Sequence, residues 1–290
     1  MVMKKKGSNA TSTRNALTWA EKELTLADIH PAGREACWLL EHVLQADTVL
    51  GSRAFEQMLP AETVESFYAL VRKRASHYPL QYLLGSLEFA GITLAVTPDV
   101  LIPRPETEYL VERILIRVPD RTAELVCADL GTGSGCLALA LSAALPQSCW
   151  HACDTSTAAL KLADSNAVHN HVSDRILWYC GNWFEAYCDT QVFDMIVSNP
   201  PYVAEGEALA PELGFEPAVA LYGGRDGMDA WRVIIGGLPE RLAPGGFFAG
   251  EFGLHQETML EHLARQAGFR TVGFEADLSG RMRYIFIVQN

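Results

Sequence analysis

Two consecutive prolines directly after a run of apolar residues set the strongest constraint on how this chain can fold. Residues 193–198 are largely apolar and partly β-branched, which predicts a buried strand. The strand must end at Asn199-Pro200-Pro201-Tyr202, because proline has no backbone N–H for the sheet and fixes φ. The sequence therefore predicts a rigid turn at the carboxyl end of a strand, where open α/β sheets bind their ligands.

This turn has the chemistry to bind a planar group that carries an NH2. The Asn199 side-chain oxygen and the Pro200 carbonyl accept hydrogen bonds, and the Tyr202 ring can stack on a flat amide or base. Pro201 stiffens the same turn. The alternative is a simple strand-ending turn in which Tyr202 belongs to the hydrophobic core, and the turn by itself leaves that alternative open.

A second motif, upstream, also indicates a ligand site. An apolar strand that ends near Asp129 runs into Gly131-Thr132-Gly133-Ser134-Gly135 and then into a helix-like segment. Glycines at this place let a ligand approach the backbone closely. A pyrophosphate-binding fingerprint needs a further glycine where this chain has Cys136, so the spacing favours a ligand without phosphates. Asp154 ends the next apolar run and can accept two ribose hydroxyl groups.

These motifs resemble those of the class I S-adenosylmethionine-dependent methyltransferases. Residues 129–135 are similar to their motif I, and residues 199–202 to their motif IV for methylating an amide or an exocyclic amino nitrogen. A third segment, Leu101-Ile-Pro-Arg104-Pro-Glu-Thr107, closely resembles the one that marks the HemK/PrmC family. Enzymes of that family methylate the side-chain nitrogen of the glutamine in the Gly-Gly-Gln motif of class 1 peptide chain release factors.

The resemblance covers about residues 79–283 and implies a cofactor, a protein partner and a set of site residues. The implied cofactor is S-adenosyl-L-methionine, the products are N5-methylglutamine and S-adenosylhomocysteine, and no metal ion is expected. The expected cofactor-binding residues are Asp129, Gly131, Thr132, Gly133, Ser134, Gly135, Asp154, Asn182, Trp183 and Asn199. The expected substrate-binding residues are Arg104, Asn199, Pro200, Pro201 and Tyr202, of which Asn199, Pro200 and Tyr202 are the expected catalytic residues.

Asn182 departs from the family pattern. The family usually has an aspartate there, and the resemblance places that residue near the adenine amino group. Asn182 can still accept a hydrogen bond through its amide oxygen, but without the strength that a negative charge gives. This substitution bears on cofactor affinity rather than on the reaction.

The pattern of apolar residues predicts three parts. Residues 1–85 carry helix-spaced apolar groups and predict a small helical domain, expected to recognise the substrate, and residues 86–105 predict a linking β-hairpin. Residues 106–290 alternate strands with helices, which predicts a Rossmann-like α/β methyltransferase domain with a parallel sheet. Within it, residues 244–246 predict a turn before the strand 247–251. Residues 203–226 form a long loop that we expect to act as a lid over the substrate peptide.

The distribution of charge indicates which class of partner the chain binds. Residues 86–290 contain thirteen Lys and Arg against twenty-six Asp and Glu, and Lys161 is the single lysine among them. An N6-adenine or N2-guanine nucleic-acid methyltransferase needs basic surface to neutralise phosphates, so this alternative is disfavoured and a protein partner is favoured. A non-catalytic cofactor-binding adaptor is the third hypothesis. The basic cluster Arg72-Lys73-Arg74 is expected to be a solvated helix face.

The sequence also bears on the compartment. No segment reaches 18 consecutive apolar residues, so we expect no membrane span and no membrane partner. Lys4, Lys5 and Lys6 are followed by polar residues rather than by an apolar stretch, so a secretory signal is not expected. Seven cysteines without a C-x-x-C pair suit free thiols in a reducing cytoplasm.

Overall fold

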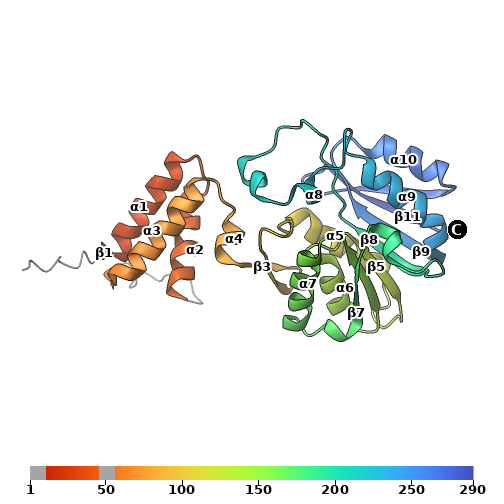
Figure 1. Cartoon of the computed structure of the whole chain (residues 1–290), viewed down its shortest axis with the longest axis horizontal. Coiled ribbons are helices and arrows are strands. Elements are labelled where there is room, and N and C mark those ends of the chain that lie inside the picture. The colour runs from red at the N-terminus through yellow and green to blue at the C-terminus, as the bar shows by residue number, and fades with distance from the viewer. Residues whose placement is uncertain (1–10, 46–55, 290) are drawn as a thin grey trace, which may run out of the picture. The chain divides into compact units, whose positions relative to one another are not determined.

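The computed structural model describes residues 11–45 and 56–289, so Lys4 to Lys6 lie outside the described residues. The chain divides into two compact units. The first, here called the helical unit, comprises Met1–Gly85 together with Ala210–Phe215. The second, the sheet unit, comprises Ser86–Leu209 and Glu216–Asn290. A short piece of the long loop 203–226 thus groups with the helical unit, which the sequence pattern did not predict. Figure 1 shows the elements of both units.

The apolar faces of four described α-helices form the core of the helical unit. Its elements are β1 (Thr11–Ser12), α1 (Thr13–Leu26), α2 (Ala32–Leu44), β2 (Met58–Leu59), α3 (Ala61–Ala75), α4 (Leu80–Leu84) and the 3-10 turn Pro211–Phe215. Ser12 caps α1, because its side chain accepts a hydrogen bond from the Asn15 N–H at 3.3 Å. The core between the helices contains Leu24, Leu39 and Phe67, which are completely buried.

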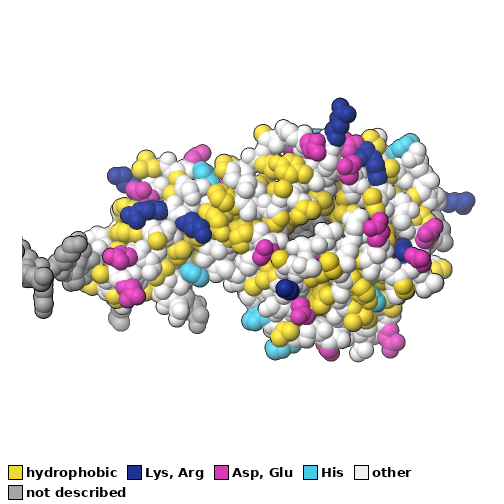
Figure 2. Space-filling view, viewed as in Figure 1, with side chains coloured by type: hydrophobic (Ala, Val, Ile, Leu, Met, Phe, Trp, Pro, Cys, Tyr) yellow, Lys and Arg dark blue, Asp and Glu magenta, His cyan; other side chains and the backbone are white. Residues whose placement is uncertain are grey.

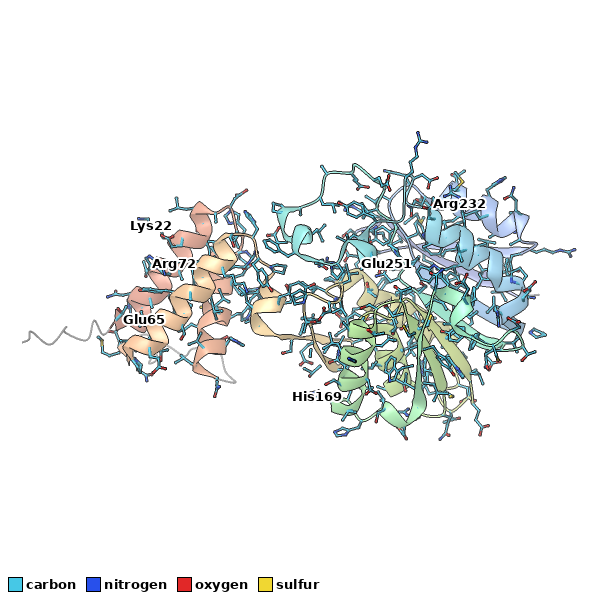
Figure 3. The ribbon with its side chains drawn as sticks, viewed as in Figure 1. Lys22, Glu65, Arg72, His169, Arg232 and Glu251 are labelled. Carbon is cyan, nitrogen blue, oxygen red and sulfur yellow. The ribbon has the colours of Figure 1, made fainter. Side chains whose placement is uncertain are left out.

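The expectation of a solvated basic face on α3 is wrong for Arg74. Arg72, labelled in Figure 3, and Lys73 are exposed, but Arg74 is 7% exposed. Its Nε donates to the Glu35 carboxylate at 2.6 Å, and its Nη1 donates to Glu212 at 3.2 Å. The period of the helix turns Arg74 toward α2, where a carboxylate compensates the buried charge.

A seven-stranded sheet forms the centre of the second unit. A hairpin of β3 (Ser86–Phe89) and β4 (Ile92–Ala95) precedes it. The sheet strands are β5 (Val126–Leu130), β6 (Cys149–Asp154), β7 (Ile176–Cys180), β8 (Phe193–Ser198), β9 (Leu242–Glu251), β10 (Thr271–Ala276) and β11 (Met282–Val288). The helices are α5 (Pro105–Arg117), α6 (Cys136–Ala144), α7 (Thr157–His169), α8 (Ala218–Leu221), α9 (Asp229–Arg241) and α10 (Glu257–Gln266).

The spatial order of the strands is β10-β11-β9-β8-β5-β6-β7, with β11 antiparallel to both of its neighbours and the other pairs parallel. Helices cover both faces of the sheet. Consecutive residues of β5 show this, because they point to opposite faces and pack in different hydrophobic clusters. Cys127 packs in a cluster with α5 and α6, whereas Ala128 packs in a cluster with α9 and α10. The chain moves outward from β5 to β7 and then returns to β8 on the other side of β5. The carboxyl ends of β5 and β8 therefore meet where the strand order reverses, which is the usual ligand position in such sheets.

Two further details concern the expected elements. The turn predicted at residues 244–246 is instead part of β9, which is paired with β8 through a shift in register between Phe193 and Met195. An irregularity of this kind lets a glycine-containing segment stay in a strand. Among the described helices, none combines the length and the apolar character that a membrane crossing requires.

Candidate active site

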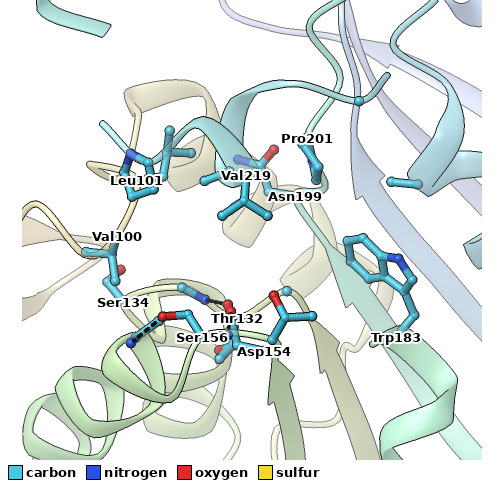
Figure 4. A pocket seen from close by; sticks show the side chains of 18 of the residues that line it. Val100, Leu101, Thr132, Ser134, Asp154, Ser156, Trp183, Asn199, Pro201 and Val219 are labelled. Atoms are coloured by element: carbon cyan, nitrogen blue, oxygen red, sulfur yellow. Dashed lines mark hydrogen bonds between the residues drawn. The ribbon is translucent and has the colours of Figure 1, made fainter. Parts of the chain in front are cut away.

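A cavity of about 350 Å3 opens at the carboxyl ends of β5, β6 and β8. That volume lies in the range of small-molecule sites. Figure 4 shows its walls, which come from the glycine-rich turn, the ends of neighbouring strands and the long loop after β8. The predicted site residues that line it are Gly131, Thr132, Gly133, Ser134, Asp154, Asn182, Trp183, Asn199 and Pro201.

The glycine-rich turn forms one side of the cavity with its backbone. The N–H groups of Gly131 and Thr132 donate to the Cys153 carbonyl at 3.0 and 2.9 Å, which fixes the turn against β6. Gly133 has a φ of 55°, a backbone conformation that residues with a side chain rarely adopt. A Cβ placed there would meet no atom within 4 Å. The turn therefore presents bare backbone to the cavity, so a ligand can approach it closely.

Asp129 lies behind this turn and does not line the cavity. It is 1% exposed, and its Oδ2 accepts hydrogen bonds from Thr132 Oγ1 at 2.7 Å and from the Ala138 N–H at 3.3 Å. Burial raises the pKa of this carboxyl to about 7. Gly135 is also outside the cavity lining, at the start of α6. These two residues hold the shape of the turn, and Asp129 adds a titratable charge beneath it.

Asp154 lines the cavity with a carboxylate that two backbone N–H groups orient. Its Oδ2 accepts from the Gly133 N–H at 2.9 Å, and its Oδ1 accepts from the Ser156 N–H at 2.8 Å. Ser156 also caps α7, since its Oγ accepts from the Ala159 N–H at 3.2 Å. Each carboxylate oxygen keeps a further lone pair for a ligand hydroxyl group.

Trp183 and Asn182 form a wall suited to a flat heterocycle. Trp183 has a φ of 48°, and its ring lies so close to Gly131 that a Cβ there would be 3.1 Å from Trp183 Cζ3. Asn182 is exposed beside it and lines the same cavity. An aromatic face next to an amide matches the stacking and hydrogen bonding that an adenine requires. Together with the bare turn and Asp154, this set of donors and acceptors fits S-adenosylmethionine.

Asn199 brings an unsatisfied acceptor to the border of the cavity. Its Nδ2 donates to Thr107 Oγ1 at 3.1 Å, whereas its Oδ1 is buried and has no hydrogen-bond partner. Ser198 ties the end of β8 to β5, because its Oγ donates to the Leu130 carbonyl at 2.7 Å. Pro200 is buried and does not line the cavity, but Pro201 does. A buried, partnerless amide oxygen is costly unless a ligand donor satisfies it.

Tyr202 lies next to the cavity rather than in its lining. Its hydroxyl donates to Glu251 Oε1 at 3.2 Å, and the guanidinium carbon of Arg283 lies 5.7 Å from the centre of its ring. Burial, and after it the charge of Glu251, raise the pKa of the Tyr202 hydroxyl. In this structure the phenol therefore belongs to a polar network behind Asn199.

Arg104 anchors the long loop. Its Nη2 donates to Glu216 Oε1 at 2.5 Å, and the Ile102 N–H donates to Glu216 Oε2 at 3.0 Å. Glu216 is buried, and the residues after it, from Pro217 to Gly224, contribute to the cavity wall. Gly223 packs on the turn 199–202, since a Cβ there would come within 2.4 Å of the Pro201 carbonyl oxygen. The two ends of this loop segment are thus fixed on residues 101–107 and on Pro201.

Sequence reasoning assigned no role to Thr107 and Glu251, which support Asn199 from behind. Thr107 belongs to the segment that carried the family resemblance, and Glu251 is an acidic residue that ends an apolar strand. An acidic residue at the end of an apolar strand was the sequence signal that could have identified Glu251. Within residues 11–45 and 56–289, no group of three or more His, Cys, Asp or Glu could hold a metal ion.

Comparison with known proteins gives two family matches. Residues 15–85 match the family described as PrmC N-terminal domain, and residues 108–214 match the family described as Methyltransferase small domain. Among solved structures, a 16S rRNA N2 methyltransferase from T. thermophilus, in complex with AdoMet and guanosine, has a TM-score of 0.53. It is 20% identical and the match covers 71% of this chain and 50% of that one. A methyltransferase from Pyrococcus furiosus has a TM-score of 0.52 at 15% identity and covers 69% of this chain and 90% of that one. These likenesses show the class I methyltransferase fold.

Curated relatives are more similar in sequence. The release factor glutamine methyltransferase of Geobacter sulfurreducens is 42% identical over 87% of this chain and 88% of its own length. That of Bordetella pertussis is also 42% identical, over 87% of this chain and 88% of its own length. The enzyme of the same description from Cereibacter sphaeroides is 39% identical and covers 93% of this chain and 96% of its own length. With its fold, its cavity and these relatives in agreement, the chain belongs to the release factor glutamine methyltransferase family.

Proposed function

We propose that this protein transfers the methyl group of S-adenosylmethionine to the side-chain nitrogen of the glutamine in the Gly-Gly-Gln motif of class 1 peptide chain release factors. The products are N5-methylglutamine and S-adenosylhomocysteine. The structural observation that carries the proposal is the buried Asn199 Oδ1 without a partner, at the border of a cavity that suits the cofactor. An NH2 group that approaches this oxygen satisfies it. Membership in the family supplies the identity of the amide.

The difficulty of the reaction lies in the nucleophile. The lone pair of a carboxamide nitrogen is delocalised into the carbonyl, as in the peptide bond. S-adenosylmethionine supplies a methyl group on a positively charged sulfur and leaves as a neutral thioether. Asn199 Oδ1 would accept a hydrogen bond from the glutamine NH2 and hold its nitrogen in line for attack. Such orientation is worth roughly 7–11 kcal/mol in favourable cases.

The same acceptor also stabilises the positive charge that develops on the nitrogen during transfer. Once the nitrogen carries the methyl group, its proton is strongly acidic and passes to water. The reaction therefore needs no strong base beside Asn199. The contribution of the protein is orientation and a charge-complementary acceptor.

We assign the recognition of the protein substrate to the helical unit and to the loop between residues 203 and 226. Support comes from the grouping of Ala210–Phe215 with the helical unit, while the following residues of the same loop line the cavity. Figure 2 shows Asp and Glu side chains scattered over the visible face of the sheet unit, without a continuous basic patch on that face. The proposed place of action is the cytoplasm, which suits seven free cysteines.

A nucleic-acid base is the second candidate substrate, since its exocyclic NH2 has the same shape and donors as an amide. The likeness in fold to an rRNA methyltransferase favours it. The excess of acidic residues in 86–290 disfavours it, because phosphate contacts need Lys and Arg.

One labelling experiment separates the candidates. The full-length protein is incubated with radiolabelled S-adenosylmethionine and with an intact release factor, the same factor with its Gly-Gly-Gln glutamine replaced by alanine, ribosomal RNA or DNA. We expect label in the intact factor alone, and we expect Asn199→Ala to abolish most of it. Label in a nucleic acid would support the second candidate, and cofactor binding without any transfer would identify an adaptor.

A further inference from the structure

Behind Asn199 lies a buried polar network that involves three distant parts of the chain. Glu251, labelled in Figure 3, ends β9 and is 1% exposed. Its Oε2 accepts a hydrogen bond from Thr107 Oγ1 at 2.6 Å, and its Oε1 accepts one from the Tyr202 hydroxyl at 3.2 Å. Thr107 is completely buried in the first turn of α5. A carboxylate at such depth is stable only when hydrogen bonds or charges compensate it.

With the Glu251 carboxylate ionised, the hydrogen bonds of this network have one consistent set of directions. A threonine hydroxyl has one proton, and Thr107 donates that proton to Glu251. Thr107 Oγ1 can therefore only accept from its other neighbour, Asn199, whose Nδ2 lies 3.1 Å away. A reversed Asn199 amide would place an oxygen against an oxygen whose proton is already engaged. The Asn199 Oδ1 is consequently left without a partner.

We propose that Thr107 and Glu251 are positioning residues that set the direction of the Asn199 amide, so that the site presents an acceptor to the substrate. Glu251 acts through Thr107, and neither residue touches the reacting atoms. An acceptor selects an NH2 group, whereas the reversed amide would present its own NH2 and would suit a carbonyl oxygen. The inference rests on the proposed function, because the group that donates a hydrogen bond to this acceptor is the glutamine amide.

Replacing Glu251 by glutamine tests the polarity with almost no change in shape. The amide of Glu251→Gln can direct an N–H to Thr107 Oγ1, which then turns its own proton toward residue 199. That proton attracts Oδ1 of Asn199, so the amide reverses and presents Nδ2 to the substrate NH2. We expect kcat to fall by roughly 10²–10³, the scale for losing one preorganised polar partner. We expect the KM for S-adenosylmethionine to stay unchanged.

A double-mutant cycle with Asn199→Asp distinguishes this role from a structural one. An aspartate has an acceptor on both sides, so its direction does not matter. In the Asn199→Asp background, Glu251→Gln should therefore lower kcat by no more than about threefold, which is a large coupling between the two sites. Equal effects of Glu251→Gln in both backgrounds would overturn the proposal.

Thr107 supplies a second test that does not depend on how Glu251→Gln folds. Thr107→Ser keeps the hydroxyl and should retain most of the turnover, whereas Thr107→Val removes the relay and should lose it. Ser148→Ala serves as a control for the loss of a buried hydroxyl elsewhere, since Ser148 donates to the Leu145 carbonyl away from the cavity. It should reduce stability but not kcat. Equal turnover of Thr107→Ser and Thr107→Val would contradict the relay.

A readout without substrate separates this proposal from the proposed function. In NMR spectra of the labelled, substrate-free protein, the Asn199 side-chain NH2 should show NOEs to the Thr107 side chain. Those NOEs should disappear in Glu251→Gln. If the wild-type protein gave these NOEs but methylated no release factor, the proposed function would fail while the orientation of Asn199 stood. Absence of the NOEs from an active wild-type protein would overturn the positioning role alone.

Discussion

The carboxylate of Asp154 accepts a hydrogen bond of 2.9 Å from the backbone N–H of Gly133, which joins the ends of β5 and β6. The glycine-rich turn and the acid that follows the next strand therefore act as one unit. Ser156 binds the other oxygen of the same carboxylate at 2.8 Å. Because two N–H groups already orient the carboxylate, its remaining lone pairs have fixed directions toward the cavity. That arrangement is preorganised to accept hydrogen bonds from a ligand, and we expect the donors to be the ribose hydroxyl groups.

Asp154→Ala should weaken the binding of S-adenosylmethionine. The substitution removes a charged acceptor, which is worth roughly 1.5–3 kcal/mol, or about a 10- to 150-fold increase in Kd. Isothermal titration calorimetry measures the effect. Asp164→Ala is the matched control, since that carboxylate is exposed on α7 and binds Trp178 outside the cavity lining. An unchanged Kd for Asp154→Ala would remove Asp154 from the cofactor site.

The binding of S-adenosylmethionine should depend on pH through Asp129. Burial raises the pKa of this carboxyl from 3.8 to about 7, so it loses its negative charge as the pH falls through 7. Because the sulfonium of the cofactor is positive, an ionised carboxylate beneath the glycine-rich turn should strengthen its binding. We therefore expect Kd to rise by up to about tenfold per pH unit below 7. S-adenosylhomocysteine is neutral at sulfur, so its Kd should depend much less on pH. Both ligands are titrated between about pH 5.5 and 8.5, the range in which the Asp129 carboxyl changes charge.

Asp129→Asn provides the control for this pH effect. Between pH 3.8 and about 7 the folded chain binds one proton more at Asp129 than the unfolded chain does, so the free energy of unfolding decreases as the pH rises through this window. The asparagine variant should lose that slope and also the pH dependence of cofactor binding. If the variant kept the pH dependence of Kd, another group would be responsible.

Tyr202→Phe should cost more than a stacking role predicts. If the ring only stacked on the substrate amide, removing its hydroxyl would have little effect. The structure instead places that hydroxyl on the buried Glu251, so we expect the free energy of unfolding to fall by about 1–3 kcal/mol and turnover to fall with it. Tyr187→Phe is a useful control, because it removes a hydroxyl that donates to the His151 carbonyl away from Asn199. It should lower stability while preserving turnover. Wild-type stability and turnover in Tyr202→Phe, together with an inactive Tyr202→Ala, would restore the stacking role.

The parts of the site that were predictable from sequence are those whose geometry depends on a few consecutive residues. A strand followed by Asn199-Pro200-Pro201-Tyr202, or by the turn 131–135, encodes its geometry locally through proline, glycine and apolar pattern. The α/β alternation predicts a parallel sheet, in which the turns that follow the strands lie at the same edge. The strand order, with β5 next to β8, then brings these two turns together. For this reason the cavity lies where the motifs indicated.

The supporting residues were not predictable, because they pair across long separations. Thr107 and Glu251 are 144 residues apart, and Arg74 and Glu212 are 138 apart. Which polar side chain faces which depends on the register of the sheet and on the path of a long loop, and neither is contained in a local pattern. Arg74 shows the consequence: its neighbours Arg72 and Lys73 are exposed as expected, but one further step along α3 turns a charged side chain into the interior.

Arg74→Met should destabilise the helical unit strongly. The substitution leaves the buried Glu35 carboxylate without its cation, a change that typically costs about 3–5 kcal/mol. Denaturant unfolding of the full-length protein, followed by tryptophan fluorescence, measures it. Arg72→Met is the matched control on the same helix and should change stability by no more than about 1 kcal/mol, because Arg72 is exposed and its contact with the Trp19 ring, 5.7 Å from the centroid, is a weak one. Similar unfolding midpoints for the two variants would show that the buried ion pair is unimportant.

An intact release factor should react far faster than a short Gly-Gly-Gln peptide. A planar acceptor such as Asn199 can orient any amide, so discrimination must come from contacts with the body of the protein substrate, and we expect kcat/KM to differ on the order of a hundredfold or more. Glu212→Gln tests whether the loop segment that contains Glu212 contributes to this discrimination. Glu212 binds Arg74 and His77 within the helical unit, at 3.2 Å in each case, although it lies in the loop whose next residues line the cavity. Weakening these bonds should reduce kcat/KM for the intact factor by about tenfold, equivalent to roughly 1.4 kcal/mol, and leave the peptide reaction unchanged.

Glu207→Gln is the matched control for that last variant, because Glu207 lies in the same loop with an exposed side chain. It removes the same charge without touching Arg74 or His77, so it should leave both substrates unaffected. An equal loss on peptide and protein in Glu212→Gln would mean that the loop acts only at the cavity. Equal wild-type rates on the two substrates would show that the turn 199–202 alone determines selectivity, and the helical unit would then need another role. A selective loss on the intact factor, seen in Glu212→Gln and not in Glu207→Gln, would trace substrate recognition through the segment Ala210–Phe215.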